Sequence, residues 1–211
     1  MVLKLDHVSF SCGKEFEITN IIPNGYDKKF EEIDLQNIAC KIPFLKRKCK
    51  THNIFMYEGE TDKSIPIEVT QYTDVVDYKT SIKLDGRRIM WPVVDTEAAK
   101  EFFVAVGGKA DSDLPRVVFK PFLDKASFEI EFVEAKDNEM PFLDVEGFSS
   151  LGIFSDNAKK EMDKMSNKGY FVTEVSEIVV DGKKMDIGFV MGKNNEIVEF
   201  ISVSKMQRGL L

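Results

Sequence analysis

A histidine near the start of the chain and a glutamate that recurs in three strand-like segments are the residues whose types and spacing could do chemistry. His7 lies in "LKLDHVSFSC" (3–12), where polar and apolar residues alternate as in a half-buried strand. The polar face carries His7, Ser9 and Ser11, and the apolar face carries Val8, Phe10 and Cys12. His7 therefore faces either water or a polar cavity, and it is either a ligand or an ordinary polar residue of a strand.

The recurring glutamate stands between apolar neighbours in "PIEVTQY", "EIEFVEA" and "IVEFISV", at Glu68, Glu131 and Glu199. The apolar neighbours are expected to face a covering helix, so the three glutamates project to the opposite face of their strands. His7 lies on that same face if each unit of the chain folds as one sheet.

The elements that must position these residues form a repeated pattern. In the last third, a strand at 148–155 precedes a helix that is capped by Ser155 or Asp156 and ends at Gly169. Three strand-like runs follow, separated by turn signals at 181–182 and 192–195. The sequence predicts the order strand, helix and three strands for this unit.

The middle and the start of the chain repeat this order less completely. The middle predicts a strand at 87–95, a helix at 96–108 capped by Asp95 or Thr96, and strands at 116–122 and 127–135. In the first unit, a region around Pro23 replaces a clean helix between "LDHVSFSC" and the hairpin "NIFMYEGE" and "IPIEVTQY". We therefore expect an α+β fold of three βαβββ modules, at 1–80, 81–138 and 139–211, with mixed sheets.

Composition excludes several functions. The 211 residues carry a net charge of −7, which argues against a nucleic-acid-binding surface, and "KRKCK" (46–50) is expected to be a solvated loop. The three cysteines lack metal or redox spacing, and no apolar run is long enough to span a membrane. No serine-hydrolase, P-loop or dinucleotide motif occurs. We expect a soluble, cytoplasmic protein with reduced thiols.

A family resemblance rests on three short segments. "LDHVSF" and "IEVTQY" look like the first and last strands of a module of the vicinal oxygen chelate superfamily, the glyoxalase-like proteins, and "VVDTEAAKEFF" looks like its strand-to-helix junction. The resemblance implies that two modules pair, so that their curved sheets enclose a cavity. It also implies that first-strand and last-strand residues of both modules hold a divalent metal there.

The resemblance assigns candidate site residues position by position. The first-strand positions are His7, Arg88 and Ser150, and the last-strand positions are Glu68, Glu131 and Glu199. It implies a metal (Zn, Fe, Mn, Ni or Co) on His7, Glu68 and Glu199, with Glu131 as a substitute ligand or catalytic base. Arg88 cannot ligate a metal and Ser150 is a weak ligand, so these two are expected to contact substrate together with Ser9 and Tyr72.

Three functions are consistent with these residues. The first is a small-molecule metalloenzyme of isomerase, epimerase or lyase type, which transfers a proton next to a carbonyl. The second is a metal-free protein that binds a small molecule, as resistance members of the resembled superfamily do; Arg88 would suit an anionic group. The third is a protein whose repeats serve assembly alone.

Other reactive side chains have less demanding interpretations. His7 and Glu68 could share a solvent-facing pair of strands without forming a site. His52 is expected to be an exposed edge residue, and Cys12 an inert core thiol. An odd number of modules leaves one concave face without a partner inside the chain, which predicts a homodimer, unless the middle unit only covers the other two.

Overall fold

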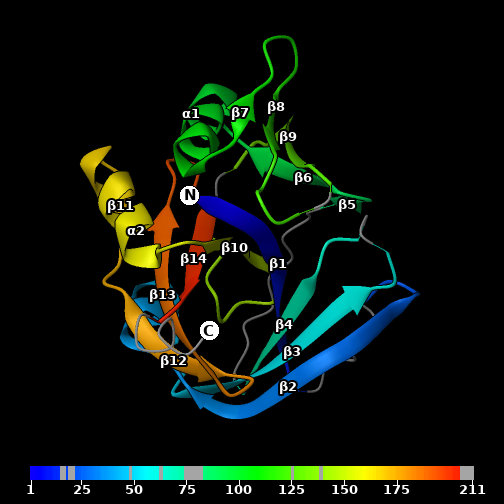
Figure 1. The fold of residues 1–211 in the computed structure, drawn as a ribbon, viewed down its shortest axis with the longest axis vertical. Helices are drawn as coiled ribbons and strands as arrows, with labels where there is room; N and C mark the ends of the chain where they lie inside the picture. The colour runs from blue at the N-terminus through cyan, green and yellow to red at the C-terminus, as the bar shows by residue number, and fades with distance from the viewer. Residues whose placement is uncertain are drawn as a thin grey trace.

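The computed structural model describes residues 1–14, 18, 22–47, 49–61, 64–73, 83–124, 126–137 and 140–204. Its strands form one nine-stranded and one five-stranded sheet, and two α-helices pack on them (Figure 1). The expected α+β fold with curved mixed sheets is confirmed. No helix among the described residues is long and apolar enough to cross a membrane.

The nine-stranded sheet combines the first and third modules. Its strands from the first module are β1 (Val2–Gly13), β2 (Tyr26–Gln36), β3 (Thr51–Gly59) and β4 (Ile67–Tyr72). Its strands from the third module are β10 (Gly147–Ser155), β11 (Phe171–Val172), β12 (Ser176–Val180), β13 (Lys183–Met191) and β14 (Ile197–Val203). β1 pairs with β10 antiparallel, while β4 runs parallel to β1 and β14 runs parallel to β10. The strands of the two modules therefore follow in the same order on either side of the β1–β10 pair.

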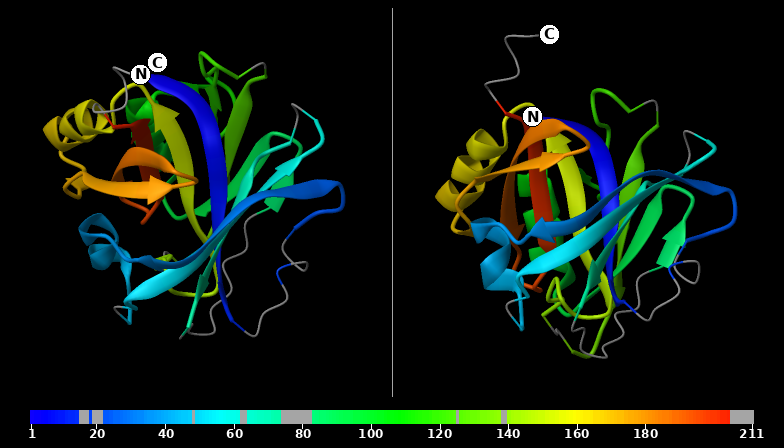
Figure 2. Two further views of the ribbon diagram at one scale, coloured as in Figure 1. Left: turned by 60° about the horizontal axis from the view of Figure 1, so that its bottom comes forward. Right: turned by 90° about the horizontal axis from the view of Figure 1, so that it is seen from below.

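The nine-stranded sheet curls, which brings its two ends together (Figure 2). The backbone amide of Asp181, at the β12–β13 turn, donates to the Glu32 carboxylate on β2 at 2.8 Å. The 3₁₀ helix η2 (Ala39–Phe44) also contacts β12, because the Cys40 amide donates to the Ser176 hydroxyl. These contacts hold the inner faces of both modules around one interior space.

The middle module forms the five-stranded sheet and covers the outside of the large one. Its elements are β5 (Lys83–Asp85), β6 (Arg88–Val93), α1 (Thr96–Val106), β7 (Lys109–Ala110), β8 (Arg116–Phe119) and β9 (Phe128–Glu134). Trp91 on β6 packs edge-on against Phe148 on β10, with ring centroids 4.7 Å apart. One apolar core unites the inner face of this sheet, α1 and the outer face of β1 and β10.

The first module has no α-helix among its described residues, as the Pro23 region indicated. The outer face of its strands still needs apolar cover, because Cys12, Ile67 and Val69 are fully buried there. Leu84 of the middle module packs on that cluster. The middle module thus supplies to the first module the cover that a helix supplies in the third.

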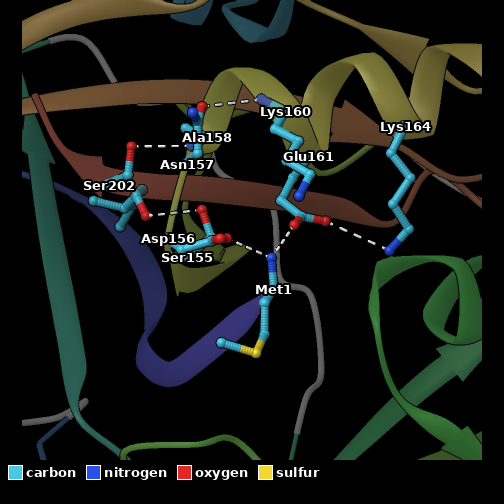
Figure 3. Close-up of polar contacts among 10 residues, drawn as sticks. Met1, Ser155, Asp156, Asn157, Ala158, Lys160, Glu161, Lys164 and Ser202 are labelled. Carbon is cyan, nitrogen blue, oxygen red and sulfur yellow. Dashed lines mark hydrogen bonds and ion pairs between the residues drawn. The ribbon is translucent and has the colours of Figure 1, made fainter. Parts of the chain in front are cut away.

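Side-chain caps set where the two helices begin. Asp95 caps α1 by accepting from the Ala98 amide, as expected from the sequence. Helix α2 (Ala158–Asn167) is capped by Asn157 and not by Ser155 or Asp156, so that expectation was wrong. Asp156 instead pairs with the amino group of Met1 (Figure 3). The carboxylate that was expected to cap the helix therefore links the start of β1 to the segment between β10 and α2.

Candidate functional site

A cavity of about 460 Å³ lies between the inner faces of the first and third modules. Its wall is mainly apolar, with Ile54, Met56, Phe154, Ile178, Met185, Ile187 and Ile201 among the lining side chains. His7, Glu68, Glu199 and Lys41 form a polar group in the same lining. A cavity that combines apolar side chains with polar groups that converge on one point is typical of a small-molecule site.

Strand register brings the histidine and the two glutamates together. His7 stands opposite Gly152 on β10, and Gly152 stands beside Glu199 on β14. Gly152 has no side chain, so the imidazole of His7 lies over its backbone, where an added Cβ would be 2.5 Å from the ring. Nε2 of His7 is then 3.5 Å from Glu199 and 3.9 Å from Glu68.

Nε2 of His7 is buried and makes no hydrogen bond within the part of the chain that the structure describes, whereas Nδ1 lies 3.1 Å from the Asp6 carboxylate. Burial alone would lower the pKa of His7, but Glu68, Asp6 and Glu199 together raise it well above 6.5. Burial likewise opposes the charge of Asp6, yet its bond to His7 and the nearby Lys4 hold its pKa at about 2. An imidazole oriented by one carboxylate thus points its other nitrogen at two more.

Hydroxyl groups hold Glu68 in place. Its Oε1 accepts from Ser9 at 3.3 Å and from Thr70 at 3.0 Å, which leaves Oε2 toward His7. A polar recess of about 10 Å³, room for about one water molecule, adjoins these groups. Ser9, Ser150 and Tyr72, three of the four expected substrate contacts, line this recess and not the main cavity.

Arg88 and Glu131 do not line either space. They lie on the outward face of the middle sheet, where Arg88 pairs with Glu129 at 2.5 Å and with Glu131 at 3.4 Å. The roles expected for Glu131 as base and Arg88 as substrate contact at this cavity are therefore corrected. Arg88 and Glu131 do lie on adjacent strands of the middle module, as the repeated spacing predicted. The face of the sheet that carries them points away from the other two modules.

Two buried residues of the site were not expected from the sequence. Lys41 on η2 is 5% exposed, and its Nζ lies 3.2 Å from Nε2 of His52. His52 is 2% exposed and stacks on Tyr72, so the expectation of an exposed edge residue was wrong. β2 pairs outside β3 and η2 packs over it, which removes the edge. A lysine inside the short apolar segment "ACKIPF" is the only sequence signal for this pair.

We expect His52 to make the protein sensitive to acid. Burial, and then the charge of Lys41, lower the pKa of His52 from 6.5 to about 2. Below pH 6.5, His52 therefore binds a proton in the unfolded chain but stays neutral in the folded chain. The free energy of unfolding falls as the pH falls. At pH 5 this loss amounts to about 2 kcal/mol.

Urea denaturation at pH 7 and pH 5 measures this effect. The wild-type protein should lose about 2 kcal/mol more of its unfolding free energy than His52→Phe, which keeps a ring on Tyr72. Equal losses in the two proteins would show that His52 is not held neutral by its surroundings.

Comparison with known proteins gave similar structures only. No family model and no curated protein matches the sequence. An integron cassette protein from the mobile metagenome of V. cholerae is 15% identical, with a TM-score of 0.42 over 59% of this chain and 100% of that chain. A glyoxalase/bleomycin resistance protein/dioxygenase from Alicyclobacillus acidocaldarius is 16% identical, with a TM-score of 0.39 over 64% of this chain and 94% of its own.

A glyoxalase I mutant from Zea mays is 12% identical, with a TM-score of 0.40 over 98% of this chain and 70% of its own. Every TM-score quoted lies below 0.5, so the description of the fold rests on the strand order and pairing of this chain.

Proposed function

We propose that the protein is a small-molecule enzyme that transfers a proton next to a carbonyl group, with a divalent metal held by His7, Glu68 and Glu199. The observation that carries this proposal is the buried Nε2 of His7, which has no hydrogen-bond partner among the described residues and points at two carboxylates beside the cavity. One imidazole and two carboxylates suit Zn, Fe, Mn, Ni or Co.

The donor atoms fit such a metal after a small adjustment. Two ligands at metal-bond distance in a tetrahedral site lie about 3.3 Å apart. The two distances from Nε2, 3.5 and 3.9 Å, are longer, and no group of three or more His, Cys, Asp or Glu among the described residues is already arranged as a metal site. A shift of about half an ångström by the Glu68 carboxylate would close the gap.

Each residue of the group has a distinct part in this chemistry. Asp6 accepts from Nδ1 of His7 and so keeps the lone pair on Nε2, the arrangement that a ligating histidine needs. A bound metal would polarise the substrate carbonyl and make the neighbouring C–H more acidic. A carboxylate oxygen of Glu199 or Glu68 that faces the cavity can then accept and return the proton.

The raised pKa of His7 favours one second candidate, a metal-free protein that binds a small molecule. A proton on Nε2 would balance the two carboxylates as a cation would, and the cavity would then serve only to hold a ligand. The metal and the proton compete for the same nitrogen, so metal content separates the two candidates.

Self-association of the protein as a homodimer also stays a prediction.

Metal analysis of protein purified without chelator tests the proposal. We expect about one first-row metal ion per chain in the wild type and none in His7→Ala, because the remaining carboxylates hold such a metal weakly. Added metal should raise the Tm of the chelator-treated wild type and not that of the variant. Wild-type protein without metal, whose Tm does not respond to added metal, would leave the binding protein as the function.

A further inference from the structure

The charged side chains around the cavity are paired with one exception. Lys4 lies 3.0 Å from Asp6, Lys29 lies 3.9 Å from Glu58, and Lys183 lies 3.3 Å from Asp181. These lysines are 40%, 46% and 67% exposed and lie toward solvent. Lys41 is the fourth lysine of the lining, and it is buried.

Lys41 has no carboxylate partner among the described residues. Its one hydrogen-bond partner there is Nε2 of His52, and no carboxylate oxygen lies within 4.0 Å of Nζ. An ammonium group has three donor hydrogens, so His52 satisfies only one of them. A buried charge of this kind is costly unless an opposite charge or further hydrogen bonds satisfy it.

Two glutamates line the same recess as Lys41, but neither pairs with it. Glu68 accepts from two hydroxyls with one oxygen and turns the other toward His7, and Glu199 also faces His7. Both glutamates share the lining of the small recess with Lys41 but lie beyond ion-pair distance from it. The positive charge of Lys41 is therefore left to the contents of the cavity.

We propose that Lys41 is the anion-binding residue of this cavity and that the ligand is a small organic carboxylate with an apolar body. The carboxylate accepts from Nζ of Lys41, while the body lies against apolar side chains such as Ile54 and Ile187, which line the same cavity. The hydrogen bond from Nζ of Lys41 to Nε2 of His52 fixes the direction of the lysine side chain. This inference deepens the proposed function by naming the ligand class of the same cavity, but it does not require the metal.

Calorimetric titration with two matched probes tests the inference. 4-Phenylbutyrate and 4-phenylbutanamide have the same apolar body and differ in the charge of the head group. The wild type should prefer the carboxylate by about tenfold or more, the effect of a charge-assisted hydrogen bond in a buried site. Lys41→Met should lose this preference, and Lys41→Arg should retain most of it.

Lys29→Met is the matched control, because it removes an exposed lysine from the same lining. It should keep the preference of the wild type. Equal binding of the two probes by the wild type, no binding of the carboxylate at millimolar concentration, or a preference that persists in a folded Lys41→Met would each overturn the inference. Each variant is first checked for a wild-type thermal transition, and Lys41→Gln, which should also lose the preference, takes the place of Lys41→Met if that variant does not fold.

The same titration with chelator-treated protein keeps this result separate from the proposed function. A preference that survives chelation supports the anion site, whether or not the purified protein held a metal. Protein that is purified without metal, and whose Tm does not respond to added metal, contradicts the metalloenzyme and leaves the anion site standing. A metal-containing protein that binds both probes equally supports the metalloenzyme and contradicts the anion site.

Discussion

Glu199→Gln should weaken metal binding at least about 100-fold, because loss of an outer partner alone costs 10- to 100-fold and Glu199 is expected to be a direct ligand. Glutamine keeps the shape of the side chain and one carbonyl oxygen but removes the charge that faces His7 at 3.5 Å. Isothermal titration of the chelator-treated protein with Zn²⁺ measures the change.

The repeat offers a matched control for this experiment. Glu131 stands at the same position of the last strand of the middle module, but it contacts Arg88 on the outward face. Glu131→Gln should therefore leave metal affinity within about twofold of the wild type, since partly exposed ion pairs contribute little. If both substitutions weakened binding equally, the metal site would not be the one between β1 and β14.

Gly152→Ala should disrupt the same site without removing any of its polar groups. A Cβ at this position would lie 2.5 Å from Cε1, 2.6 Å from Nε2 and 2.8 Å from Nδ1 of His7. The imidazole must move off Gly152, which changes the direction of Nε2 relative to Glu68 and Glu199. We expect a loss of about 1–3 kcal/mol in the free energy of unfolding from overpacking. We also expect metal affinity to fall by tenfold or more, a weakening of the size that misplaced support for a ligand causes.

Gly188→Ala on β13 separates a local effect on His7 from general crowding. The added Cβ there would come within 2.9 Å of Met162, whose flexible thioether chain can move aside. This variant should be destabilised less and should bind metal like the wild type, as judged by thermal denaturation and the same titration. Wild-type metal affinity in Gly152→Ala would mean that the ring of His7 need not stand where the structure places it.

The local sequence pattern was enough to determine on which face of its strand each of the site residues lies. The alternation around His7 and the apolar neighbours of Glu68 and Glu199 predicted that these three side chains leave the covered face, and all three line the cavity. The helix of the middle module and its Asp95 cap were also predictable, because helix ends depend on neighbouring backbone groups. These features depend on residues close in sequence, which one chain displays directly.

Only the tertiary structure decided which modules share a cavity. Glu131 and Glu199 have the same local surroundings in sequence, yet β14 reaches His7 through β10 while β9 belongs to another sheet. That choice depends on the pairing of β1 with β10, more than 130 residues later in the chain, and on the packing of Trp91 against Phe148. Lys41 and His52 became buried because η2 packs over β3 and is itself contacted by β12 of the third module. Burial by distant segments leaves no periodic signal in the residues that are buried.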